Sequence, residues 1–407
     1  MFALDSHDTV RKASRMGGSL GLPFSSPETF LVIQASSPRF NIPTRLVIPK
    51  QVSFHPFPSP PTVPSFESPL FTTRTGPIKA GPDFKSITKS KIATGVWCEP
   101  KPDLITGRVK KWAEAAKVET IRVPGYWYTS PRKKIAAGSQ AQPNEKVLYH
   151  FHAGAYIMET AHPNGISTPV ITGLLEKTES VNRLFSLEYR LSSFTPFPIA
   201  NPFPAALIDA VTGYNYLISE LGFKPNNVVI VADSAGGHLA LCLLRYLVET
   251  SVLPVPGAFI GLSPLCDISS SHLAVYESSL VFETDVVGRL DKGLLKWAWK
   301  SFTGPLHDDP NDGPTKNPYF SPASVSSGIE STISFKGFPE TFLVSGGAER
   351  IRDAVRTLRQ RLVRDLGEGK VTAYEAPDGI HDFLAFAWHE PERTEVLRLL
   401  SSWVDRR

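Results

Sequence analysis

A serine between a predicted strand and a predicted helix is the first candidate for chemistry in this chain. The apolar, β-branched run 228–231 stops at Ala232-Asp233-Ser234-Ala235-Gly236, and a helical pattern follows without a linker. This layout is typical of a nucleophile elbow, a strained turn that exposes a serine hydroxyl above a sheet. Small residues are needed two positions before and after the serine because strand and helix nearly touch there, and Ala232 and Gly236 meet that need. Ser234 is therefore the predicted nucleophile of an acyl transfer.

A loop of small residues upstream could supply the hydrogen-bond donors that such a serine needs. The predicted strand 146–151 runs directly into His152-Ala153-Gly154-Ala155-Tyr156. Acyl transfer places negative charge on the former carbonyl oxygen, and preorganised backbone N–H donors are usually the largest electrostatic contribution to its stabilisation. We predict that the amides of Gly154, Ala155 and Ala235 form this oxyanion hole. Alanine can replace glycine at positions 153 and 155 if the φ angles allow it, because an amide needs no particular side chain.

Four sequence blocks in this order resemble the hormone-sensitive-lipase-like branch of the α/β-hydrolases. They are His-Ala-Gly-Ala-Tyr at 152–156, Glu-Tyr-Arg-Leu at 188–191, Phe-Pro-Ala-Ala at 203–206 and Ala-Asp-Ser-Ala-Gly-Gly at 232–237. The family usually shows His-Gly-Gly-Gly, Asp-Tyr-Arg-Leu, Phe-Pro-Ala-Ala and Gly-Asp-Ser-Ala-Gly-Gly. The resemblance covers the chain from about Ile87 to its C-terminus. It implies an α/β-hydrolase fold, with a mostly parallel, doubly wound sheet and a helical cap.

The resemblance also implies a base and an acid, which α/β-hydrolases carry in the order Ser, acid, His. His381 matches the family's His-Gly-Phe or His-Asp-Phe pattern and is the predicted base that accepts the Ser234 proton. Glu349 occupies the register of the triad acid, where the family commonly shows Asp-Pro-Leu-Arg-Asp, and glutamate serves in some members. Asp353 is the alternative acid. Its other interpretation is a carboxylate stabilised by the dipole at a helix N-terminus.

Three polar residues near these motifs are interpreted as structural. Asp233 is expected to accept hydrogen bonds that hold the elbow and the loop 152–156 together. Glu188 and Arg190 are expected to form a buried ion pair beneath the site, and truncating one of them would leave an uncompensated charge.

Metal chemistry is not predicted. His150, His152 and His162 have no cysteine or carboxylate cluster that would complete a ligand set. The stretch 307–313 faintly resembles a calcium loop, but Pro310 occupies a ligand position and a solvated turn fits better. No metal and no organic cofactor is expected.

Composition favours a globular enzyme with a small-molecule substrate. The 407 residues are 42% hydrophobic with a mean hydropathy of −0.09, and the formal net charge is only +4. Such a charge indicates neither nucleic-acid binding nor a membrane surface, and no run of about 18 apolar residues predicts a transmembrane helix. Cys98, Cys242 and Cys266 are expected to be buried free thiols. We expect an ester substrate, a monomer or homodimer, no stable membrane insertion and a cytoplasmic location.

The first 85 residues differ from the rest. The stretch 43–69 contains eight prolines, which excludes regular helix and central strand. Residues 1–20 lack the apolar core of a secretory signal. We predict a disordered, Pro/Ser-rich extension over 1–85 and an α/β-hydrolase domain over 86–407. The stretch between the strands ending at 262 and starting at 342 far exceeds an ordinary connection. The resemblance implies that this insertion and N-terminal helices form a cap, expected at about 86–118 and 268–335.

Strands and helices alternate along the domain, which predicts a mostly parallel sheet with active residues at the carboxyl ends of its strands. Helices are expected at 104–117 and 291–302. The predicted strands lie at 120–123, 147–151, 184–188, 228–231, 258–262, 342–345 and 371–374. The aromatic residues Phe282, Trp297, Trp299 and the cluster 126–128 either line an acyl pocket or pack between cap and core.

These observations predict a serine carboxylesterase that hydrolyses short- to medium-chain acyl esters through an acyl-enzyme on Ser234. An aryl formamidase or acetamide deacetylase with the same triad is one alternative, and a triacylglycerol lipase is less favoured because no extended lipid-binding surface is visible. A non-catalytic small-molecule-binding relative, such as the family's plant hormone receptors, is another alternative. That alternative expects loss of the histidine, which is present here. Alanine at 153, 155 and 232 could also indicate decay through backbone strain.

Overall fold

The computed structural model describes residues 33–34, 45–46, 92–133, 135–274, 285–288 and 291–407. The chain divides into two compact units, residues 1–58 and 59–407. In the first unit, strands β1 (Ile33–Gln34) and β2 (Arg45–Leu46) pair antiparallel. The predicted disorder of residues 1–85 falls, apart from these two strands, outside the described residues.

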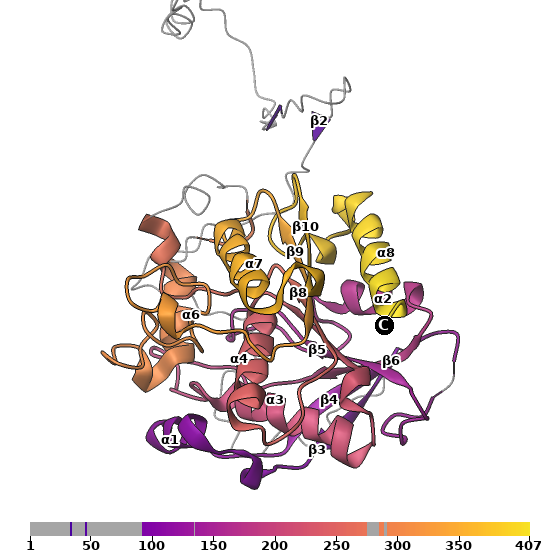
Figure 1. The fold of residues 1–407 in the computed structure, drawn as a ribbon, viewed down its shortest axis with the longest axis horizontal. Coiled ribbons are helices and arrows are strands. Elements are labelled where there is room, and N and C mark those ends of the chain that lie inside the picture. Colours follow the sequence, from indigo (N-terminus) through magenta and orange to yellow (C-terminus); the bar gives the residue numbers. More distant parts are fainter. Residues whose placement is uncertain (1–32, 35–44, 47–91, 134, 275–284, 289–290) are drawn as a thin grey trace, which may run out of the picture. The chain divides into compact units, whose positions relative to one another are not determined.

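An eight-stranded sheet organises the second unit (Figure 1), in the order β10-β9-β8-β7-β5-β6-β4-β3. Only β4 runs against the others among these strands, which confirms the predicted mostly parallel sheet. The strand expected from residue 120 begins at Val123 instead. The strands are β3 (Ala93–Cys98), β4 (Val123–Thr129), β5 (Lys146–Phe151), β6 (Val181–Leu187), β7 (Val228–Asp233), β8 (Ala258–Leu262), β9 (Glu340–Gly346) and β10 (Val371–Ala376).

Helices cover both faces of this sheet and create two apolar cores. Along β7, residues 228, 230 and 232 belong to one core and residues 229 and 231 to the other, because successive side chains of a strand point to opposite faces. Helices α2 and α8 pack together on one face, and α3, α4 and α7 cover the other (Figure 1). The helices are α1 (Gly107–Ala116), α2 (Thr168–Lys177), α3 (Ala205–Asn215), α4 (Ala235–Thr250), α6 (Gly293–Thr303), α7 (Arg352–Leu366) and α8 (Glu392–Asp405).

Burial on both faces explains why the sequence of β7 is apolar without interruption over residues 228–232. Every residue of β7 is buried, as is usual for a parallel strand covered by helices on both sides. No helix within the described residues has the length and apolar character that crossing a membrane requires.

The segment predicted as the first part of the cap divides between sheet and helix. Residues 93–98 form β3, which pairs antiparallel with β4 along its whole length, so this part was wrongly placed in the cap. Helix α1 instead contacts the long insertion after β8. The Arg108 guanidinium and the Trp112 indole N–H both donate to the carboxylate of Asp312, at 2.6 and 3.1 Å.

Within that insertion, the stretch 307–313 forms a turn. One carboxylate oxygen of Asp309 accepts hydrogen bonds from the amides of Asn311 and Asp312, at 2.8 and 2.7 Å. This contact confirms the interpretation of the stretch as a turn. The aspartate satisfies backbone donors of its own loop, a common role for this residue.

The aromatic residues proposed for an acyl pocket lie in different places. Trp127 packs in the core, with its ring centroid 5.1 Å from that of Phe185 and its indole N–H donating to Tyr216 at 3.3 Å. Trp299 of α6 borders a cavity of about 440 Å³ that Lys296 and other residues of the insertion also line. Trp127 is therefore a core residue, and Phe282 lies outside the described residues.

Candidate active site

Ser234 occupies the turn between β7 and α4. Its backbone angles are φ 51° and ψ −114°, a conformation that an L-residue adopts only when its surroundings impose it. Three backbone hydrogen bonds hold Ser234 in this conformation. The Ser234 amide donates to the Leu262 carbonyl at 3.0 Å, and its carbonyl accepts from the amides of Leu265 and His238 at 2.9 and 3.1 Å. The strand–turn–helix arrangement predicted from the sequence is confirmed.

The start of α4 lies against the end of β5, which explains the requirement for a small residue at 236. A Cβ atom on Gly236 would lie 2.1 Å from the carbonyl oxygen of Phe151. No side chain fits at that distance without a backbone shift. Ala232, two residues before Ser234, is fully buried, so a methyl group is accommodated there.

The structure brings Ser234, His381 and Glu349 into one hydrogen-bonded line. His381 Nε2 lies 2.8 Å from Ser234 Oγ, and His381 Nδ1 lies 3.2 Å from Glu349 Oε2. A carboxylate only accepts hydrogen bonds, so the Nδ1–H donates to Glu349 and Nε2 can accept the serine hydroxyl. Both His381 and Glu349 are buried. This arrangement can move a proton from serine to histidine while the carboxylate fixes the imidazole tautomer.

The alternative acid, Asp353, has other partners. It lies in the first turn of α7, and its carboxylate is 3.3 Å from Arg352 and 3.5 Å from Arg356. Among the described residues, no ion pair or hydrogen bond joins Asp353 to His381. Its position matches the helix-dipole interpretation.

Residues 153–156 form the loop predicted to supply the oxyanion donors, which we call the oxyanion loop, and they carry unusual backbone angles. Gly154, Ala155 and Tyr156 have consecutive φ values of 111°, 51° and 64°. A Cβ atom on Gly154 would lie 2.2 Å from the carbonyl oxygen of Met158, so only glycine fits there. Ala155 adopts the left-handed conformation despite its methyl group. The backbone at this position therefore accommodates alanine where the family usually has glycine.

Asp233 links this loop to the elbow, as expected. One carboxylate oxygen lies 2.9 Å from His150 Nε2, and the other accepts from the Ala153 amide at 3.2 Å and the Ser167 hydroxyl at 2.6 Å. His150 also contacts Ser186 Oγ through Nδ1, at 2.7 Å. His150 is thus engaged in a structural network. Within the described part of the chain, no group of three or more His, Cys, Asp or Glu side chains is arranged to hold a metal ion.

The predicted ion pair between Glu188 and Arg190 is wrong. Arg190 pairs instead with Asp209 of α3, at 2.8 Å, with both groups buried. Glu188 accepts hydrogen bonds from the Thr160 hydroxyl at 2.6 Å and the Ala161 amide at 2.8 Å. The two side chains follow the end of β6 and extend towards different segments, so each one binds a different partner.

Asp285, which the sequence did not indicate, joins the loops that carry Glu349 and His381. Its carboxylate accepts from the His381 amide at 2.9 Å and from the Arg350 amide at 2.7 Å. Asp285 lies in the insertion, 96 residues before His381. No local pattern could have indicated this contact, because the chain separation is long and the partners are backbone amides.

A second missed carboxylate belongs to Asp382, directly after the histidine. Its Oδ2 lies 3.4 Å from His381 Nε2, and its amide donates to Ser263 Oγ at 3.2 Å. The His-Asp-Phe pattern contained this residue, but the sequence does not say where its side chain turns. His381 therefore has carboxylates near both ring nitrogens.

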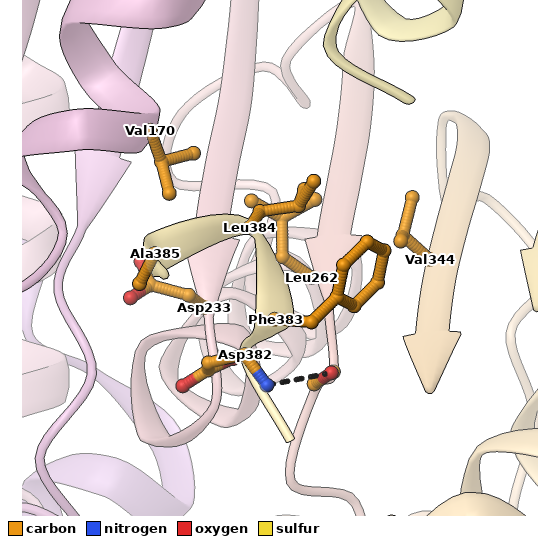
Figure 2. Close-up of a pocket in the computed structure, with 9 residues that line it drawn as sticks. Val170, Asp233, Leu262, Val344, Asp382, Phe383, Leu384 and Ala385 are labelled. Atoms are coloured by element: carbon orange, nitrogen blue, oxygen red, sulfur yellow. Dashed lines mark hydrogen bonds between the residues drawn. The ribbon is translucent and has the colours of Figure 1, made fainter. Parts of the chain in front are cut away.

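Asp382 and Asp233 border the same small cavity (Figure 2). The cavity measures about 10 Å³, and Figure 2 draws both aspartates among the residues that line it, together with the apolar residues Leu262 and Phe383. A space of this size holds about one water molecule. Burial raises the pKa of Asp382 well above its usual value; the charge of His381 opposes this effect, and the charge of Asp233 adds to it.

The carboxylates around His381 favour its charged form. Burial alone would lower the pKa of His381, but the charges of Asp382, Glu349 and Asp285 outweigh burial and raise this pKa above its ordinary value. Burial raises the pKa of Glu349, and the hydrogen bond with His381 opposes that effect. A base with a raised pKa must lose its proton before it can accept one from serine, so activity should fall at low pH.

We expect the substitution Asp382→Asn to move the acid limb of the pH profile. Removing this negative charge lowers the pKa of His381, so the neutral imidazole persists to lower pH and the midpoint of kcat/KM should fall by about one pH unit. The measurement is kcat/KM for p-nitrophenyl acetate from pH 6 to 11, corrected for uncatalysed hydrolysis, because the pKa of His381 is raised to about 10. Asp378→Asn, an exposed residue of the same loop, is the matched control and should leave the midpoint unchanged. An unshifted midpoint in Asp382→Asn would mean that Asp382 is already neutral when His381 titrates.

Comparisons with known proteins agree with this geometry. Residues 148–385, more than half of the chain, match a family model described as alpha/beta hydrolase fold. An acetyl-hydrolase of Streptomyces hygroscopicus is 25% identical, over 64% of this chain and 74% of the relative. The esterase LipU of Mycobacterium tuberculosis is 22% identical, over 65% and 79%.

A solved structure has the same fold. It is an esterase from the bacterial hormone-sensitive lipase family, with a TM-score of 0.54, 21% identity and coverage of 79% of this chain and 87% of the other. The fold class predicted from the four sequence blocks is thereby confirmed. With the family model spanning β5 to the loop of His381, this chain belongs to the α/β-hydrolase family.

Proposed function

We propose that this chain is a serine carboxylesterase that hydrolyses short- to medium-chain acyl esters through an acyl-enzyme on Ser234. The observation that carries the proposal is the 2.8 Å contact between Ser234 Oγ and His381 Nε2 at a strained turn above the sheet. Strain of this kind persists only where the surrounding structure imposes it, and it clusters at functional sites. The names of the relatives, acetyl-hydrolase and esterase, support the same activity.

In the first half of the reaction, Ser234 Oγ attacks the ester carbonyl and its proton passes to His381 Nε2. Glu349 stabilises the imidazolium that forms, through the Nδ1–H bond. The tetrahedral intermediate collapses as His381 returns the proton to the leaving alcohol. The acyl group then remains on Ser234.

In the second half, water replaces the alcohol. His381 accepts a proton from the water, the hydroxide adds to the acyl carbonyl, and the carboxylic acid leaves as Ser234 regains its proton. Residues of the chain carry every proton transfer in this scheme.

The amides of Gly154, Ala155 and Ala235 are our proposed donors to the oxyanion. Ala235 is the first residue of α4, and amides in the first turn of a helix have no partner within the helix. The Ala153 amide is already committed to Asp233, so it is left out of the set. Removing one such donor typically costs about 10²- to 10³-fold in kcat.

Turnover of p-nitrophenyl acetate, butyrate and decanoate by the full chain tests the proposal. We expect the highest kcat/KM on the acetate or butyrate ester, and stoichiometric labelling by a fluorophosphonate that peptide mapping places on Ser234. An aryl formamide and an aryl acetamide, assayed in parallel, separate the esterase from an amidase with the same triad. A folded protein with neither turnover nor label would exclude a serine hydrolase and favour a binding relative.

A further inference from the structure

We propose that Tyr156 is a positioning residue that holds the oxyanion loop in its strained conformation and couples this loop to helix α6. The inference rests on the proposed esterase function and deepens it, because it concerns how the donors of that site are held. Tyr156 contributes no donor of its own to the reaction. It acts through the amides of the residues just before it.

The oxyanion loop needs an anchor because its backbone is strained. Ala155 and Tyr156 both have positive φ values, 51° and 64°, which is uncommon for any residue but glycine and a clear outlier for a bulky one. Two such residues in succession persist only where other contacts hold them. Those contacts therefore determine where the amides of Gly154 and Ala155 point.

The hydroxyl and carbonyl of Tyr156 both make short hydrogen bonds. Its carbonyl accepts from the Ser192 amide at 2.7 Å, and its hydroxyl lies 2.7 Å from His238 Nδ1. His238 Nε2 lies 3.0 Å from the Phe320 carbonyl. Because a carbonyl only accepts, Nε2 carries the proton and Nδ1 accepts from Tyr156. Burial lowers the pKa of His238 to about 4, which keeps this ring neutral, and the contact with the Phe320 carbonyl fixes its tautomer.

This chain of hydrogen bonds links the loop to the helix of the nucleophile. His238 belongs to the first turns of α4, and its amide donates to the carbonyl of Ser234. The hydroxyl of Tyr156 thus fixes the oxyanion loop relative to the segment that carries Ser234 and the Ala235 amide. Donors on two separate segments can point at one oxygen only if the two segments are held in a fixed position relative to each other.

The ring of Tyr156 makes the connection to α6. It stacks on Phe302, with ring centroids 3.8 Å apart and an interplanar angle of 13°. Tyr156 is completely buried and Phe302 nearly so. A shift of α6 would therefore displace Tyr156, the residue that holds the strained loop. The position of the insertion and the geometry of the oxyanion hole are coupled in this way.

The substitution Tyr156→Phe tests the hydroxyl. It keeps the ring and its stacking on Phe302 but removes the bond to His238. We expect kcat on p-nitrophenyl butyrate to fall by about 10-fold, with KM changed by less than about 2-fold, because the loss concerns a group that acts on the developing oxyanion. Affinity for butyl trifluoromethyl ketone, to which Ser234 adds to form a tetrahedral oxyanion, should fall by the same factor.

Tyr214→Phe is the matched control. Tyr214 is also fully buried and its hydroxyl donates to the Pro254 carbonyl at 2.8 Å, in a different part of the core. We expect this variant to lose a comparable amount of thermal stability and to keep kcat and affinity for the ketone. Phe302→Leu, which removes the stacking partner, should lower kcat and ketone affinity in parallel as Tyr156→Phe does.

Three outcomes contradict the proposal in distinguishable ways. Wild-type kinetics and ketone affinity in Tyr156→Phe would overturn the role of the hydroxyl, and the esterase assignment would stand. Wild-type behaviour in Phe302→Leu would overturn the coupling to α6. A folded wild-type protein that neither turns over esters nor binds the ketone would overturn the esterase assignment together with this inference.

Discussion

Replacing Ser234 by alanine is expected to lower kcat on p-nitrophenyl acetate by about 10⁵- to 10⁶-fold, the range typical for loss of a serine nucleophile. No other hydroxyl takes its place on His381 among the contacts of the described residues. Labelling by a fluorophosphonate should disappear at the same time. Affinity for a non-reactive substrate analogue should stay within about 3-fold, because binding to the remaining site does not use the hydroxyl.

A matched control separates loss of the nucleophile from loss of a buried serine. Ser401 of α8 is buried and accepts a hydrogen bond from the Thr178 hydroxyl at 3.2 Å, on the face of the sheet covered by α2 and α8. Ser401→Ala should retain kcat within about 2-fold while losing about 1 kcal/mol of stability. Full turnover by Ser234→Ala in a preparation free of wild-type enzyme would refute the proposed mechanism.

Glu349→Gln is expected to lower kcat by about 10⁴-fold, and Asp353→Asn by less than about 3-fold. Glutamine preserves the volume of the side chain but can donate to Nδ1. The imidazole can then adopt the tautomer with its proton on Nε2, where it no longer accepts from Ser234. The charge that stabilises the imidazolium is lost as well. Asp353 has its arginine partners on and beside the first turn of α7, so its substitution should affect stability more than rate.

The conservative variant Glu349→Asp completes this comparison. It keeps the charge but shortens the side chain by one methylene, so the 3.2 Å contact to Nδ1 lengthens. An intermediate loss of kcat is expected, since small misplacements of catalytic groups cost up to about 10²-fold. The measurement is kcat, normalised to active sites by burst titration. A large loss in Asp353→Asn with little in Glu349→Gln would instead identify Asp353 as the acid.

The local features of the candidate site could be predicted from sequence because short segments encode them. The apolar run of β7, the small residues around Ser234 and the helical pattern of α4 are adjacent in the chain. Burial of β7 on both faces required a continuous apolar stretch, and the approach of α4 to β5 required glycine at 236. These constraints act within one strand–turn–helix unit, so the residues alone indicate them.

The sequence by itself thus determined the order of the elements, the elbow at Ser234 and the candidates His381 and Glu349. Only the tertiary structure placed Glu349 rather than Asp353 beside His381, paired Arg190 with Asp209, and brought Asp285 from the insertion to the His381 amide. The physical reason is that a charged group pairs with whatever partner the fold brings within a few ångströms. When two groups lie on different elements, the distance between them in the folded structure cannot be read from their separation in the sequence.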